Sequence, residues 1–107
     1  DPDCRRCMPW SEIHSEENQE KIATMRKLIM LRRNEKTCRS PHFHFPDTYE
    51  NDRCVEYIKI DEEGNKMEVL LNASDEDVKV KGNGEVVFAR EFDGEILGVN
   101  GTLIRRI

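Results

Sequence analysis

Apolar positions first recur at a helical period in residues 16–34, which read EENQEKIATMRKLIMLRRN. Ile22, Met25 and Ile29 share one stripe, and the LIML run at 28–31 places apolar side chains nearly all the way round. Acidic residues in the first turn and arginines in the last turn suit the helix dipole. The pattern predicts a helix that is buried on more than one side. The rest of the chain looks able to supply only one apolar partner for it.

From residue 54 onward the pattern changes to the two-residue period of β-strands. Gly64 lies in the loop DEEGN, where a positive φ suits a hairpin, and GNG, Asp93-Gly94 and Asn100-Gly101 are further turn signals. About six short strands separated by such turns are typical of a small antiparallel β-sandwich, here expected to be of the Greek-key type. The predicted strands are 54–60, 66–74, 77–81, 85–90, 95–99 and 102–107, and HFHF at 42–45 could form another.

The elements divide the chain unevenly. Residues 1–15 and 35–53 contain prolines and short polar residues and are predicted to be irregular. The helix therefore reads as the last element of one domain, and the strands as a complete second domain. We place the two parts at 1–35 and 36–107. Because the sequence starts on Asp-Pro rather than on Met, we expect it to be a piece of a longer protein.

Composition and charge argue against some classes of binding partner. The 107 residues include 17 Lys and Arg against 22 Asp and Glu, which gives a net charge of −5. This balance argues against a nucleic-acid or membrane surface, and no apolar run approaches the roughly 18 residues of a membrane span. The four cysteines are too sparse for a typical secreted disulfide framework, so we expect free thiols in a cytoplasmic protein.

The pair Cys4-x2-Cys7 could belong to a zinc or a redox site. A zinc site usually needs a second knuckle of similar spacing, which this sequence lacks. Redox pairs begin a helix that follows a strand, and the predicted helix here starts too late. His42 and His44 would share one side of a strand, although exposed imidazoles without a metal explain them better. We therefore expect no metal and no cofactor.

Other polar and aromatic groups also have structural explanations. The acidic pairs Asp61–Glu63 and Asp75–Asp77 lie in predicted turns, where carboxylates are usually solvated. No arrangement for general acid–base or nucleophilic catalysis is visible. Five aromatic residues could form a sugar-stacking platform, but packing is the more common role. They are Trp10, Phe43, Phe45, Tyr49 and Tyr57.

Two motifs together resemble a known family. DPDCRRCMPW at 1–10, followed by MRKLIMLRR at 25–33, resembles the end of the catalytic barrel in the alpha-amylase family of glycoside hydrolases. The branch with the strongest likeness is that of the neopullulanases, cyclomaltodextrinases and maltogenic amylases. In that branch a β-sandwich follows the barrel, and one of its strands reads much like MEVLLNASDE at 67–76. The likeness is weak at 35–53 and beyond residue 85.

The resemblance implies roles for residues of the first loop. Asp1 and Arg5 would contact sugar hydroxyls beside the cleaved bond, because a carboxylate accepts and a guanidinium donates in a fixed fork. Asp3 and Arg6 would hold the shape of the loop. Cys4 and Cys7 would be packing residues.

The resemblance also implies a function for the whole protein. The family hydrolyses α-glucosidic bonds with retention, using carboxylates on upstream strands of a (β/α)8 barrel. The present chain would then be non-catalytic by itself and would stabilise the barrel, its main partner. The substrate would be an α-glucan or a cyclomaltodextrin. Without the barrel, residues 22–31 would leave an apolar surface that favours self-association.

Two alternatives remain open at this stage. The β-sandwich could be a free-standing carbohydrate-binding module, which an exposed coplanar pair among Phe43, Phe45, Tyr49 and Tyr57 would favour. The chain could also be a small metal or redox module that uses its cysteines.

Overall fold

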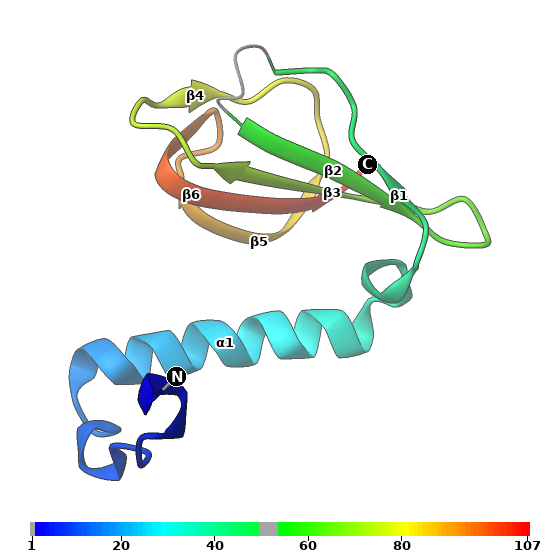
Figure 1. Cartoon of the computed structure of the whole chain (residues 1–107). Coiled ribbons are helices and arrows are strands. Elements are labelled where there is room, and N and C mark those ends of the chain that lie inside the picture. Colours follow the sequence, from blue (N-terminus) through cyan, green and yellow to red (C-terminus); the bar gives the residue numbers. More distant parts are fainter. Residues whose placement is uncertain (1, 50–53) are drawn as a thin grey trace.

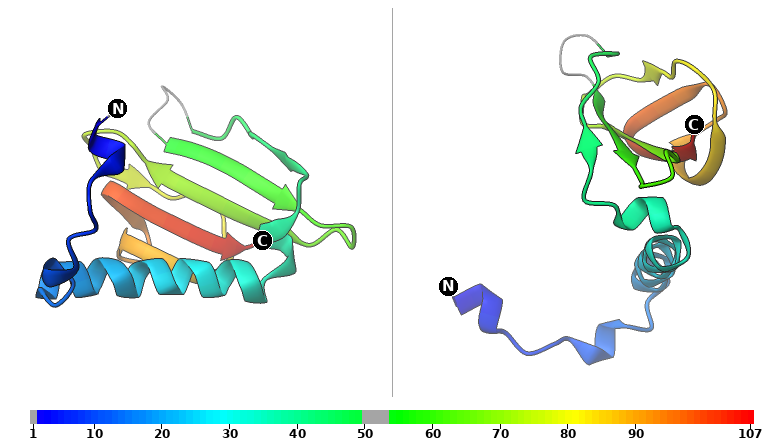
Figure 2. Two further views of the ribbon diagram at one scale, coloured as in Figure 1. Left: turned by 60° about the horizontal axis from the view of Figure 1, so that its bottom comes forward. Right: turned by 90° about the vertical axis from the view of Figure 1, so that its right-hand side faces the viewer.

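A helix and a curled antiparallel sheet make up the computed structural model, which describes residues 2–49 and 54–107 (Figure 1). The helix α1 lies along one face of the sheet, and the segment before it extends away from the sheet (Figure 2). The elements are the short 3-10 helices η1 (Pro2–Arg5), η2 (Trp10–Glu12) and η3 (Lys36–Arg39), the helix α1 (Glu16–Asn34), and the strands β1 (Phe43–His44), β2 (Cys54–Ile60), β3 (Lys66–Asn72), β4 (Val78–Lys79), β5 (Glu85–Phe92) and β6 (Ile96–Arg106).

The predicted helix over 16–34 is confirmed at both ends. Ser15 caps its N-terminus, since the Ser15 Oγ accepts a hydrogen bond of 3.2 Å from the Asn18 amide. At the other end the Glu35 amide donates to the Leu31 carbonyl before the chain turns into η3. The segments predicted to be irregular instead contain single turns of 3-10 helix, at η1, η2 and η3.

The strands pair in antiparallel fashion throughout the described sheet. The hairpin of β2 and β3 keeps a continuous register from Cys54 opposite Asn72 to Ile60 opposite Lys66. Gly64 in its loop has a φ of 84°, a conformation that glycine adopts without strain. β1 adds to the outer edge of β2, and β3 pairs on its other side with β6.

The prediction that Asn100-Gly101 ends a strand is wrong. β6 continues from Ile96 to Arg106, and Asn100 has a φ of 60° within it. A Cβ on Gly101 would lie 2.7 Å from the Gly98 carbonyl oxygen, so only glycine fits this bend. Asn100 and Gly101 have the composition of a turn, but here they bend one long strand. β4 pairs with β6 before the bend and β3 pairs with it after the bend, while β5 pairs on both sides of it.

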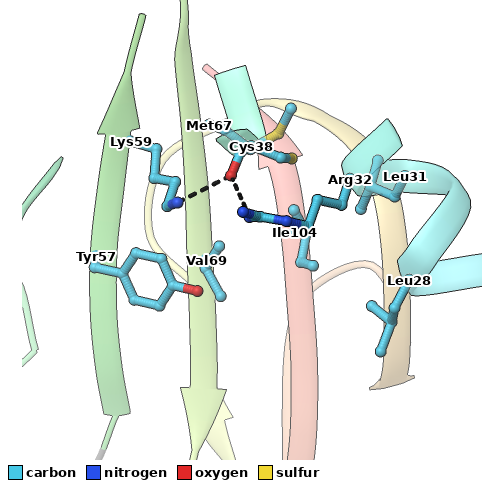
Figure 3. Close-up of a pocket in the computed structure, with 9 residues that line it drawn as sticks. All are labelled: Leu28, Leu31, Arg32, Cys38, Tyr57, Lys59, Met67, Val69 and Ile104. Atoms are coloured by element: carbon cyan, nitrogen blue, oxygen red, sulfur yellow. Dashed lines mark hydrogen bonds between the residues drawn. The ribbon is translucent and has the colours of Figure 1, made fainter. Parts of the chain in front are cut away.

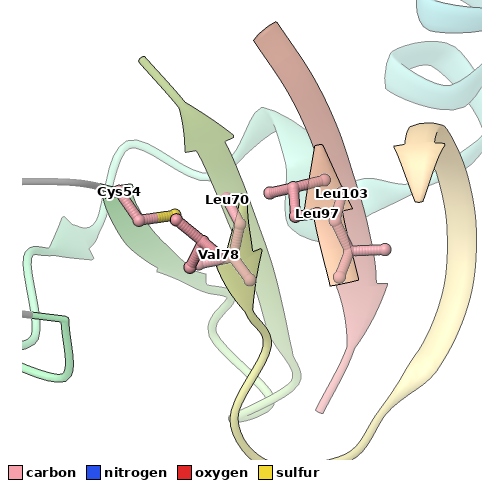
Figure 4. Close-up of a cluster of buried hydrophobic side chains, with 5 residues drawn as sticks. All are labelled: Cys54, Leu70, Val78, Leu97 and Leu103. Carbon is pink, nitrogen blue, oxygen red and sulfur yellow. The ribbon is translucent and has the colours of Figure 1, made fainter. Parts of the chain in front are cut away.

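The curled sheet has two apolar clusters, one on each face of β2, β3 and β6. Inside the curl, one cluster joins side chains from β2, β3, β4 and β6 (Figure 4). Its members are Cys54, Leu70, Val78, Leu97 and Leu103. On the outer face, Met67, Val69 and Ile104 pack against Leu28 and Leu31 of α1. Arg106 further ties the sheet to the end of α1 through an ion pair with Glu35.

The predicted fold class is thereby confirmed. The chain is mainly β, and its described residues form six antiparallel strands preceded by one α-helix. Hydrogen bonds join all six strands into one sheet, and the bend in β6 folds that sheet over its own core in the manner of a sandwich. In the part of the chain that the structure describes, no helix is long and apolar enough to cross a membrane.

Candidate functional site

In the predicted substrate loop, residues 2–5 form η1, residues 6–9 are irregular and Trp10 begins η2, and residues 3–10 are exposed to solvent. Arg5 lies at the last position of η1 with its side chain exposed, whereas Asp1 lies outside the described residues. Arg6 forms an ion pair of 2.8 Å with Asp3 three residues earlier. The pair fits the loop-shaping role expected of these two residues, although both side chains are so exposed that it stabilises the loop only slightly.

All four cysteines are free thiols. Cys4 and Cys7 are exposed, and among the residues that the structure describes no three His, Cys, Asp or Glu side chains gather where they could hold a metal ion. Burial raises the pKa of Cys38, and it raises the pKa of Cys54 to about 11. The half-buried Cys38 and the buried Cys54 are therefore protonated thiols at neutral pH, which makes them unreactive packing residues.

Cys38 lies in a pocket of about 150 Å³ between α1 and the outer face of the sheet (Figure 3). The Cys38 carbonyl oxygen accepts hydrogen bonds from Lys59 at 2.9 Å and from Arg32 at 3.1 Å. The other lining residues are apolar or aromatic: Leu28, Leu31, Tyr57, Met67, Val69 and Ile104. Because the Arg32 and Lys59 side chains at this pocket donate to backbone carbonyls, the surface left to a ligand is mostly apolar.

Three of the candidate aromatic residues form a cluster near the edge of the sheet, in which Phe43 and Phe45 are exposed and Tyr57 is half-buried. The ring centroids of Phe43, Phe45 and Tyr57 lie 5.6–6.4 Å apart. Their planes meet at 65–85°, which is edge-to-face packing and not a flat platform. Tyr49 packs instead against the cluster inside the curl. The coplanar pair that would favour a carbohydrate-binding module does not occur among these four rings.

The helix α1 exposes a second apolar side. Met25 is 57% exposed and Ile29 is 50% exposed, although Leu28 and Leu31 on the neighbouring side pack against the sheet. Trp10 in η2 is also exposed. The sheet thus covers one side of α1, and the expected burial of the helix on more than one side does not occur in this structure. A second apolar partner stays a prediction. An uncovered stripe of this kind indicates a contact surface.

Asp61 is not the solvated turn residue that the sequence predicts. It is buried, and its carboxylate accepts hydrogen bonds from the Thr37 hydroxyl at 2.8 Å and from the Asn65 amide groups. Burial alone would raise the pKa of Asp61, but these hydrogen bonds lower it. Asp61 therefore fixes η3 onto the loop between β2 and β3. The turn pattern could not reveal this, because Thr37 lies 24 residues away along the chain.

Sequence reasoning also missed a buried charged cluster on the inner face of the sheet. Glu56, Glu68 and Arg105 are each at most 6% exposed, and Arg105 donates a hydrogen bond to Glu68. A signal was available. Each of these residues interrupts an apolar strand, and a charge in a strand that is covered on both faces needs a partner.

Comparisons with known proteins agree with the resemblance in the sequence. No family model matches the chain. The maltogenic alpha-amylase of Bacillus acidopullulyticus is 36% identical to it over 81 residues, which are 74% of this chain and 13% of that protein. A crystal structure from Salmonella typhimurium, provisionally described as an alpha-amylase, has a TM-score of 0.71 and 20% identity over 91% of this chain and 17% of its own.

The two relatives support one class of protein and then one family within it. The chain is mainly β, and the structural relative has the same fold over 91% of this chain. The resemblance to the alpha-amylase family is confirmed, and the chain corresponds to a region of such a hydrolase. It spans only 13% of the curated relative and 17% of the structural one.

Proposed function

We propose that the chain is the C-terminal part of a retaining α-glucan hydrolase of the neopullulanase and cyclomaltodextrinase kind. Residues 1–35 form the end of its catalytic barrel, and residues 36–107 form a β-domain that stabilises the barrel. The observation that carries this proposal is the two-sided apolar surface of α1. The sheet covers Leu28 and Leu31, and Met25 and Ile29 stay exposed for a second body to cover.

The upstream barrel fits this second body. In the proposed enzyme Asp1 and Arg5 contact the α-glucan or cyclomaltodextrin, while the carboxylates that perform the reaction lie upstream. The chain alone then has no catalytic activity and takes no cofactor. A cytoplasmic location is supported by the four free thiols, which an oxidising compartment would tend to pair.

Hydrolysis of cyclomaltodextrin and pullulan by the 107-residue chain and by the longer protein that contains it tests the proposal. We expect the longer protein to release reducing sugar from at least one of them and the 107-residue chain to release none. An inactive longer protein, or one without a barrel upstream, would contradict the proposal. Activity of the short chain would contradict its non-catalytic role.

The exposed stripe also predicts self-association of the isolated chain. Replacing both Met25 and Ile29 by Lys removes apolar area and adds charge repulsion, so we expect dimers or larger species of the unmodified chain to dissociate into monomers. Sedimentation velocity over a range of concentrations measures this. The control variant V86K/V99K changes two apolar residues that are exposed on strands and adds the same charge. A monomeric unmodified chain, or equal dissociation of the control, would rule out association through α1.

A further inference from the structure

Two carboxylates and one guanidinium lie buried together inside the curled sheet. Glu68 on β3 lies directly opposite Arg105 on β6, and the Arg105 Nε donates to the Glu68 Oε1. Glu56 lies on the adjacent strand β2 and is 6% exposed. If both carboxylates were ionised, one negative charge in this buried site would have no counter-charge. Such a charge is costly, so one of the two acids has a strong tendency to hold a proton.

Glu56 is the acid that holds the proton. Its Oε1 is fully buried and has no hydrogen-bond partner among the described residues. Burial, followed by a hydrogen bond to Glu68, raises the pKa of Glu56 to about 7, and contacts with Thr48 and Arg105 oppose this rise. A protonated Glu56 can donate to Glu68, which leaves the ion pair of Glu68 with Arg105 undisturbed.

Other titratable and charged groups face Glu56 from the neighbouring elements. Glu68 faces it from β3, Arg105 from β6 and Tyr49 from the segment before β2, while Cys54 lies on β2 itself. Burial raises the pKa of Tyr49 and the pKa of Cys54. Both therefore stay neutral when Glu56 titrates.

The cluster also holds two segments that cross the inner face, residues 48–49 and 81–82, here called the strap. The Arg105 guanidinium donates to the Lys81 carbonyl at 2.5 Å and to the Gly82 carbonyl at 3.3 Å. Lys81 in turn donates from its amide to the Tyr49 hydroxyl at 3.0 Å and from its Nζ to the Thr48 carbonyl at 2.9 Å. Arg105 is thus the link between the carboxylates and the strap.

We propose that Glu56 is a proton-operated latch on the strap. When Glu56 is protonated, Arg105 pairs with Glu68 alone and keeps its remaining donors on Lys81 and Gly82. When Glu56 loses its proton to solvent, a second carboxylate competes for the same guanidinium. Opening of the strap then admits water to the buried charge, so the strap is closed below neutral pH and loosened above it.

Nuclear magnetic resonance of the 107-residue chain between pH 5 and pH 9 tests the latch. We expect the amide signals of Lys81 and Gly82 to shift with a common midpoint near pH 7. This midpoint should be retained in Glu62→Gln, which removes an exposed carboxylate, and lost in Glu56→Gln. We also expect the unfolding equilibrium constant in urea to rise about tenfold from pH 6 to pH 8 in the unmodified chain and to stay nearly constant in Glu56→Gln.

The protein is more stable at lower pH because the folded chain binds the Glu56 proton more tightly than the unfolded chain does. The folded chain binds it with a pKa of about 7, against an ordinary value of 4.5. The stabilisation by the proton is therefore complete below pH 4.5, declines as the pH rises and is lost above about pH 7.

Two results would overturn the latch. One is a strap that does not respond to pH, and the other is a response that Glu56→Gln leaves unchanged. If Glu56→Gln does not fold, the carboxyl carbon of Glu56 can be titrated in the unmodified chain. A midpoint near 7 supports the latch, and a midpoint below about 5.5 overturns it, because Glu56 would then be ionised throughout the neutral range.

Discussion

Replacing Arg105 by Met in the 107-residue chain is expected to lower the free energy of unfolding by about 3–5 kcal/mol. The guanidinium neutralises the buried Glu68, and it holds the Lys81 and Gly82 carbonyls. Methionine fills a similar volume but leaves these acceptors without a donor. Urea unfolding at neutral pH, followed by circular dichroism, measures the change. A loss of this size would leave a small domain only marginally folded.

Arg90→Met is the matched control for this prediction. Arg90 lies on the neighbouring strand β5 and is exposed, so its replacement is expected to change the free energy of unfolding by less than about 0.5 kcal/mol. If Arg105→Met lowered the free energy of unfolding by less than about 1 kcal/mol, the charged cluster would not be important for the stability of the sheet. The proposed latch would then lose its link to the strap.

Local sequence patterns predicted the elements whose causes are local. The bounds of α1 follow from Ser15 as cap, the acidic first turn and the apolar spacing, all within a few residues of the helix. The hairpin of β2 and β3 follows from two strand-like segments joined by a loop that contains Gly64. The sequence also shows that α1 has more apolar positions than one packing partner can cover.

The features that the sequence did not reveal depend on residues far apart in the chain. Asn100 and Gly101 have the composition of a turn, and only the pairing of β6 with β4, β5 and β3 decides that the strand continues through them. Glu68 and Arg105 are 37 residues apart and meet only after the register of β3 and β6 is set. An alternation of apolar and polar residues predicts one buried face for each strand, whereas both faces of β3 are covered here.

The predicted substrate contacts could be recognised only by resemblance. The exposed Arg5 has no packing that would identify it as a ligand-binding residue, and Asp1 lies outside the described residues. In the proposed enzyme, the upstream barrel would complete the sugar site. What the structure adds is a difference between two adjacent arginines. Arg6 is held by Asp3, whereas Arg5 forms no ion pair with the described residues. We propose that the exposed Arg5 guanidinium contacts the ligand, since it can donate in a fixed fork.

Replacing Arg5 by Ala in the longer enzyme is therefore expected to lower kcat/KM for its α-glucan substrate by about 10- to 100-fold, because a charged hydrogen bond to the sugar contributes about 1.5–3 kcal/mol. Arg5→Lys should recover only part of the loss, since lysine keeps the charge but not the planar fork. Arg6→Ala removes only a surface ion pair and should change kcat/KM by less than about threefold. Equal losses in Arg5→Ala and Arg6→Ala would mean that both act through the shape of the loop. An unchanged Arg5→Ala would rule out the predicted substrate contact.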